Sequence, residues 1–143
     1  MARHHQQAAP DTPRRLDFSL RATRTAPRMA RRALSQLRLP LPVAFDAQLL
    51  VSELVSNSVR HAGLGRDDLI RVIADWSGDR LRVHVRDGGG PPRASPVSAS
   101  IRPAPGAESG WGLYLVDRLA SRWGTTTSGY WFELRGDQPH PGF

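Results

Sequence analysis

Two polar side chains lie four residues apart in an otherwise apolar segment. The segment runs from Phe45 to Ala62 and contains Glu53 and Asn57, the only asparagine in the chain. Asparagine is disfavoured inside helices because its side chain competes for backbone hydrogen bonds. Residues four apart lie on one helix face, so a carboxylate and an amide oxygen would project together. The pair suits a magnesium ion and a polarised water, although a polar stripe facing solvent gives the same pattern.

An aspartate followed by glycines forms a second candidate site. Apolar and polar residues alternate strictly from Leu81 to Asp87, and Asp87 keeps the inward phase of Val83 and Val85. An inward carboxylate in an apolar cleft can accept a hydrogen bond from an exocyclic amine, such as that of adenine. Asp87-Gly88 is also a strong turn signal, so a simple turn at this position remains an alternative.

A third candidate site is the glycine-containing segment 109–113, which opens a predicted helix after a long loop. Gly110 and Gly112 would expose backbone N–H groups at the helix N-terminus, where phosphates bind readily. A flexible hinge at the start of the helix is the alternative interpretation.

The remaining pattern predicts the elements that must position these residues. We expect helices over 28–37, 45–62 and 111–123, and strands over 16–20, 69–76, 81–87 and 130–135. Ser77-Gly78-Asp79 predicts a turn that joins two of the strands as an antiparallel hairpin. Pro40 and Pro42 should end the first helix, and Gly124 the third. Apolar residues expected on the buried faces of the first two helices include Met29, Ala30, Ala33, Leu34, Leu37, Phe45, Leu49, Leu50, Val51, Leu54, Val55 and Val59.

Length and composition favour one small globular domain. The chain has 143 residues and no cysteine, which excludes disulfides, thiolate metal sites and a cysteine nucleophile. It has no apolar stretch typical of a membrane helix or a signal peptide, so we expect a cytoplasmic protein. We expect a disordered basic arm over 1–15, a domain over 16–135 with a lid at 88–110, and a frayed tail over 136–143.

The positive charge is concentrated near the N-terminus. Residues 1–38 carry nine arginines and two aspartates, whereas residues 39–143 carry eleven arginines and eleven acidic residues. Because the rest of the chain sums to zero, we do not expect a nucleic-acid partner. The chain has no lysine, which excludes a phosphate-binding lysine of the P-loop kind.

In chain order, the three segments resemble the motifs of the GHKL ATPase superfamily. Glu53-Leu-Val-Ser-Asn57-Ser-Val-Arg-His61 is similar to its N box, and Asp87-Gly88-Gly89 to the start of its G1 box. Gly110-Trp-Gly112-Leu113 is similar to its G2 box. The runs SELVSNSVRHA, GWGLYLVDRLASRWG and YWFEL most resemble small bacterial anti-sigma factor serine/threonine kinases. The resemblance implies the Bergerat ATP-binding fold, an α/β (α+β) two-layer sandwich whose mixed, mainly antiparallel sheet carries helices on one face.

The resemblance also implies a ligand and a role for each residue. ATP would bind with Mg²⁺, and Asn57 would be the protein ligand of the metal. Glu53 would be the catalytic base that polarises the attacking water or hydroxyl. Asp87 would read the adenine amine, and Gly89 would let the backbone approach the base.

Phosphate contacts would come from backbone N–H groups of Gly110, Gly112 and Leu113. The lid departs from the family pattern because Pro91 occupies the second glycine position of the G1 box. Proline has no N–H and a fixed φ, so lid closure is expected to differ.

The implied function is a Mg-ATP-dependent kinase that regulates transcription by acting on a sigma factor or an anti-anti-sigma protein. The alternative is a non-catalytic, ATP-dependent interaction switch. Related small kinases often form dimers, so a homodimer is compatible with the resemblance, and no membrane partner is expected.

Overall fold

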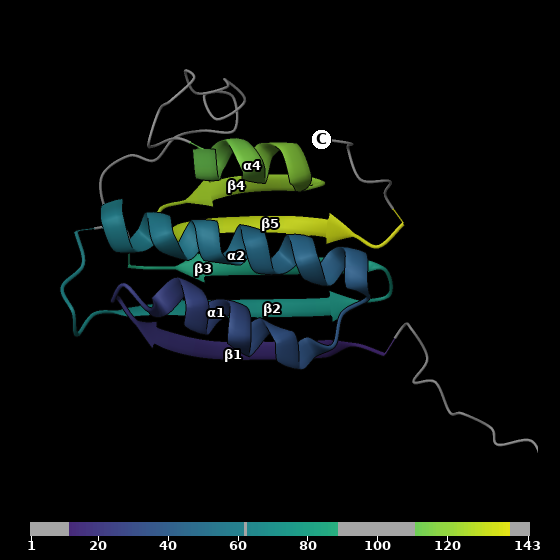
Figure 1. Ribbon diagram of the computed structural model, residues 1–143, viewed down its shortest axis with the longest axis horizontal. Coiled ribbons are helices and arrows are strands. Elements are labelled where there is room, and N and C mark those ends of the chain that lie inside the picture. Colours follow the sequence, from purple (N-terminus) through teal and green to yellow (C-terminus); the bar gives the residue numbers. More distant parts are fainter. Residues whose placement is uncertain (1–11, 62, 89–110, 138–143) are drawn as a thin grey trace, which may run out of the picture.

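The computed structural model describes residues 12–61, 63–88 and 111–137, which form a five-stranded sheet with helices on one face (Figure 1). The strands are β1 (Arg14–Arg21), β2 (Leu69–Ser77), β3 (Arg80–Arg86), β4 (Arg122–Thr126) and β5 (Gly129–Arg135). The helices are α1 (Ala26–Leu34), the 3-10 helix η1 (Ser35–Leu37), α2 (Leu41–His61) and α4 (Trp111–Leu119). The expected two-layer fold is confirmed.

The strand order in the sheet is β1-β2-β3-β5-β4. The sheet was expected to be mixed and mainly antiparallel. Among the described strands, each neighbouring pair is antiparallel and no parallel pair occurs. The β2–β3 hairpin turns at Gly78, as expected, and the φ of 67° at Gly78 explains why a glycine is needed there.

The hydrophobic core lies between the sheet and α2. Leu81, Val83 and Val85 of β3 are fully buried, as their alternation predicts, and Phe132 of β5 joins them. On the helix side, α2 buries a set of residues that spreads over much of its circumference, which is typical of a helix in the centre of a layer: Val43, Ala47, Leu50, Val51, Leu54 and Val55. None of the helices in the described ranges is long and apolar enough to cross a membrane.

The first strand is longer than predicted. β1 begins at Arg14, so the last two residues of the segment expected to be a disordered arm are in the sheet. The Arg14 guanidinium donates a hydrogen bond to the carbonyl of Leu37 (2.6 Å), which fastens the start of the strand to the end of η1. At the other end of the domain, the Gly136 N–H donates to the carbonyl of Asp79 (2.6 Å), and the rest of the expected tail lies outside the described residues.

The predicted boundaries and faces of the first two helices were partly wrong. Pro42 does not end a helix but lies in the first turn of α2, where its missing N–H has no helical partner to lose. Met29 and Phe45 were expected to be buried, yet they are 50% and 71% exposed. Periodicity predicts which helix face is apolar, but it does not predict how much of that face the neighbouring elements cover. Here the covered surface does not extend to Met29 and Phe45.

The predicted helix over 111–123 was too long. α4 ends at Leu119, and the following residues form β4, a strand that the sequence analysis missed. Trp123 is buried opposite Phe132 of β5, and its indole donates to the Asp117 carboxylate (3.0 Å). Gly124 does not end a helix either, because it lies within β4 against the indole of Trp131.

Protonation of His84, on the sheet face opposite the helices, is coupled to folding. Burial, together with the positive charges of Arg82 and Arg86, lowers the pKa of His84, and Asp75 opposes this shift. The unfolded chain therefore binds a proton near the ordinary pKa of about 6.5, whereas the folded chain does so only at lower pH. By linkage, stability should fall as the pH decreases through about 6.5.

We therefore expect the melting temperature of the wild type to fall between about pH 7.5 and pH 5.5, and that of His84→Gln to fall less. Thermal denaturation followed by circular dichroism at each pH measures both. Equal decreases in the two proteins would contradict the coupling.

Candidate functional site

The second half of α2 carries the first two candidate residues. Glu53 and Asn57 lie one helical turn apart; Glu53 is partly buried and Asn57 is 6% exposed. Asn57 is therefore not part of a solvent-facing polar stripe. Its amide is held in a largely dry environment, where a polar group requires a partner.

The N-terminal end of α4 packs against this part of α2. A Cβ atom built on Gly112 would lie 2.5 Å from Glu53 Oε2 and 3.5 Å from its carboxyl carbon. Only glycine allows this approach without displacing the carboxylate. Glu53 and Gly112, far apart in the sequence, are thus in contact, and the next residue, Leu113, is partly buried and packs against the core.

Asp87 follows the last residue of β3 and is 2% exposed, as its inward phase predicts. The hydroxyl of Ser58, itself fully buried, donates a hydrogen bond of 2.6 Å to Asp87 Oδ2. The Asp87 N–H donates to the carbonyl of Ser128, just before β5 (2.7 Å). Asp87 is therefore held by α2 on one side and by the sheet on the other.

Close packing of β5 on β3 supports this position. A Cβ atom on Gly129 would lie 1.8 Å from the carbonyl oxygen of Val85, so no other residue fits there without moving the backbone. Gly88, directly after the aspartate, has a φ of 85°, which favours glycine and turns the chain away from the strand.

These features gather at one end of the domain. In Figure 1 the C-terminal end of α2, the end of β3 and the start of α4 lie on the same side of the molecule. Glu53, Asn57, Asp87 and Gly112 are thereby brought to one region from three elements. Gly89, Gly110 and most of the expected lid lie outside the described residues.

Ser58 was not assigned a role from the sequence, whereas Arg60, which follows the N box, was expected to line the cleft. Ser58 was seen only as part of a motif, although a hydroxyl next to Asn57 on a buried helix was a signal. Arg60 donates a hydrogen bond from Nη2 to Asn57 Oδ1 (3.2 Å), and its side chain is otherwise exposed.

The oxygen atoms available here fit a magnesium ion that is held mainly by the phosphates of a bound substrate and only partly by the protein. No group of three His, Cys, Asp or Glu side chains in the described ranges could hold a metal by itself. Mg²⁺ usually keeps several waters and binds one or two protein oxygens plus substrate phosphates, and Asn57 Oδ1 offers such an oxygen. Asn57 Oδ1 has two lone pairs, so it can accept the hydrogen bond from Arg60 and still offer an electron pair to the metal.

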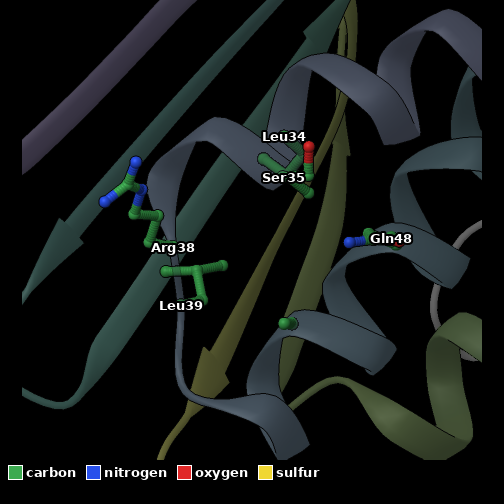
Figure 2. A pocket seen from close by; sticks show the side chains of 6 residues that line it. Leu34, Ser35, Arg38, Leu39 and Gln48 are labelled. Carbon is green, nitrogen blue, oxygen red and sulfur yellow. The ribbon is translucent and has the colours of Figure 1, made fainter.

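The cavities found on the α1 side of α2 do not define this region. Figure 2 shows one of about 80 Å³, lined by Leu34, Ser35, Arg38, Leu39, Ala44 and Gln48. A second, of about 320 Å³, has Ser56, Val59 and Arg60 among its lining residues. Neither lining includes Glu53 or Asp87, and the second cavity adjoins the candidate site at Arg60.

A comparison with protein families decides the assignment. The family model described as histidine kinase-like ATPase domain matches residues 16–130, which is most of the chain. The chain belongs to this family. The expected resemblance to the GHKL ATPases is thereby confirmed, and ATP is the ligand that a histidine kinase-like ATPase domain is expected to bind.

A solved structure shows the same fold. The crystal structure of the RsbU and RsbW domains of Rv1364c from Mycobacterium tuberculosis matches with a TM-score of 0.57 and 24% identity. The match covers 89% of this chain and 34% of that one, so this chain spans about a third of the length of the solved chain. A search of curated proteins found no match.

The Ser58–Asp87 hydrogen bond yields a testable expectation for nucleotide recognition. Ser58→Ala leaves a buried carboxylate oxygen without this donor, so ATP affinity should fall about tenfold and the preference for ATP over GTP should shrink. Calorimetric titration with each nucleotide measures both quantities.

Ser52→Ala is the matched control. Ser52 lies on the same helix, is also buried, and donates only to the backbone carbonyl of Leu49 (2.8 Å). This variant should bind like the wild type. Unchanged affinity and selectivity in Ser58→Ala would show that the serine does not position the aspartate for recognition.

Proposed function

We propose that the chain is a Mg-ATP-binding regulatory protein, a serine/threonine protein kinase of the anti-sigma-factor type that acts on a small protein partner. The observation that carries the proposal is the contact between Gly112 and Glu53, because it joins a glycine-bearing helix start to a partly buried carboxylate. A phosphate bound at that helix start would lie next to a group able to accept a proton.

Each residue of the region has a role in this proposal. Asp87, held by Ser58, accepts a hydrogen bond from the adenine amine. Backbone N–H groups at Gly110, Gly112 and Leu113 bind phosphates, and Gly89 allows the backbone to approach the base. Because backbone N–H groups rather than flexible side chains make these contacts, a small change in the position of α4 would change their distances to the phosphates.

Asn57 provides the protein oxygen for the metal. When bound, Mg²⁺ supplies neutralisation of the negative charge on the phosphates. Arg60, which donates to the same oxygen, is placed to hold Asn57 in its rotamer in the absence of the ion.

Glu53 performs the chemical step. Its carboxylate accepts the proton of the partner's serine or threonine hydroxyl, and the hydroxyl oxygen bonds to the γ-phosphorus. The bond from that phosphorus to the β–γ bridging oxygen breaks, and ADP leaves. General bases of this kind contribute about 10²–10⁴-fold to rate.

A second function is supported by a specific contact. A metal ion bound at Asn57 Oδ1 would lie close to the Arg60 guanidinium, and repulsion between the two positive charges favours a rearrangement of Arg60 at the end of α2. A non-catalytic switch, in which ATP shifts the population of conformations that bind a sigma factor or an anti-anti-sigma protein, would use that rearrangement. A cytoplasmic location and a homodimer are consistent with either function.

Glu53→Gln tests the kinase. Transfer of labelled γ-phosphate to an anti-anti-sigma-type protein from the same genome should fall by about 10²-fold or more, while ATP affinity changes little, because the amide keeps the shape but cannot accept the proton. Asp67→Asn, which removes a carboxylate from an exposed turn, should leave transfer unchanged.

If the wild type binds ATP but phosphorylates none of the candidate proteins, the kinase proposal fails and the switch remains. If Glu53→Gln transfers phosphate at the wild-type rate, Glu53 is not the base.

A further inference from the structure

The sheet face opposite the helices is covered by no helix of the described ranges, and we call it the open face (Figure 1). Every second residue of each strand lies on it, and strand pairing aligns these residues in rows. One row, read in spatial order across the sheet, is Arg15, Asp75, Arg82, Glu133 and Arg122. The alternation of charge in this row is a favourable cross-strand arrangement.

Beyond that row, the open face is strongly basic. Its arginines and carboxylates, placed by the strand pairing, are Arg15, Arg21, Arg71, Arg80, Arg82, Arg86, Arg122 and Arg135 against Asp17, Asp75 and Glu133. Each of the three carboxylates already has an arginine partner on this face, at 2.6 to 3.3 Å. Five arginines therefore remain without an ion pair to any described residue. Residues 39–143 have a net charge of zero, so the concentration of arginines on one face of the sheet is not visible in the net charge.

Like charges also lie directly opposite one another on the open face. Arg80 lies opposite Arg135 between β3 and β5, and neither has an ion pair to a described residue. Arg71 lies opposite Arg86 between β2 and β3, but its charge is paired with Asp17. Like charges at directly opposite positions destabilise a sheet. An anion bound between Arg80 and Arg135 would reduce the repulsion between their guanidinium groups, which favours an anion at this end of the open face.

An aromatic ring lies on the open face midway along β5, next to the edge strand β4. Trp131 is partly buried, and the guanidinium of Arg82 lies 4.6 Å from the centroid of its ring, with that of Arg122 at 6.0 Å. The ring also packs against Gly124, where a Cβ atom would lie 2.8 Å from the indole nitrogen. An aromatic ring flanked by guanidinium groups offers stacking and charge in one place.

We propose that the open face binds single-stranded nucleic acid. Arg80 and Arg135 at one end of the strands, and Arg86 at the other, bind phosphates, while Trp131 and Arg82 between these ends contact the bases. Arginine is suited to this use because its planar fork matches phosphate geometry. The proposal is independent of ATP binding and of the kinase activity.

The composition of the face favours nucleic acid over a protein or a lipid surface. Protein interfaces have cores depleted of charged residues, whereas nucleic-acid interfaces are polar and strongly positive. Among the large apolar side chains that are exposed in the described ranges, only Leu69 belongs to the open face. The face therefore offers few apolar side chains that could insert into a membrane or a protein pocket.

The aromatic ring favours a single strand over a duplex. Bases of a single strand can be splayed out to meet an aromatic side chain, whereas bases of a duplex are stacked on one another. A single strand can lie along the face and contact arginines at both ends.

Fluorescence polarisation of a labelled 15-nucleotide single strand, measured with the full chain over a range of salt concentrations, tests the proposal. The double variant Arg86→Ala/Arg135→Ala should bind more weakly, and its plot of log affinity against log salt should be shallower by about 1.4, since each phosphate contact contributes about 0.7 for single strands. Arg28→Ala/Arg32→Ala removes the same charge from the helical layer and should bind like the wild type.

No binding of the single strand at about 50 mM salt would overturn the proposal. So would equal weakening in both double variants, because the effect would then come from net charge or from the N-terminal segment. Tighter binding to phosphatidylserine vesicles, to an acidic peptide or to duplex DNA of the same sequence would also overturn it.

Discussion

The hydrogen bond between Ser58 and Asp87 is the interaction on which the arrangement of the site depends. It joins the central helix to the end of a central strand, and both partners are buried almost completely. A buried carboxylate is costly unless its oxygens find donors, so α2 and β3 are held in one relative position. The backbone of Asp87 is bonded in turn to Ser128, which ties the same residue to the start of β5. Recognition of a base by Asp87 would therefore use a carboxylate whose orientation is set before the ligand binds.

The second constraint is the absence of a side chain at Gly112. Because no Cβ is present, α4 can approach α2 closely enough to place its first turn against Glu53. The charge of the carboxylate and the N–H groups of the helix start then share one location, which is where a phosphate and a proton acceptor are both needed. The kinase proposal depends on this contact more than on any single polar residue.

The sequence predicted those features that follow from period and local chemistry. Examples are the inward phase of Asp87, the turn at Gly78 and the two-layer fold. They were predictable because an alternation of apolar and polar residues, or a glycine in a turn, can be recognised from a few neighbouring residues. Site features that depend on distant segments were not predictable in this way. The Ser58–Asp87 bond spans 29 positions, and the basic open face emerges only when five strands are placed side by side. β4 was missed because the residues around Trp123 continue a helical pattern, whereas its pairing with β5 decides the outcome.

The central claim is that this end of the domain binds Mg-ATP with Asn57 as the protein ligand of the metal. Titration of the wild type and of Asn57→Ala with ATP, in magnesium and in chelator, tests it most directly. The account predicts that magnesium strengthens ATP binding to the wild type and that Asn57→Ala loses this gain while keeping its affinity in chelator. An equal gain from magnesium in both proteins would contradict it.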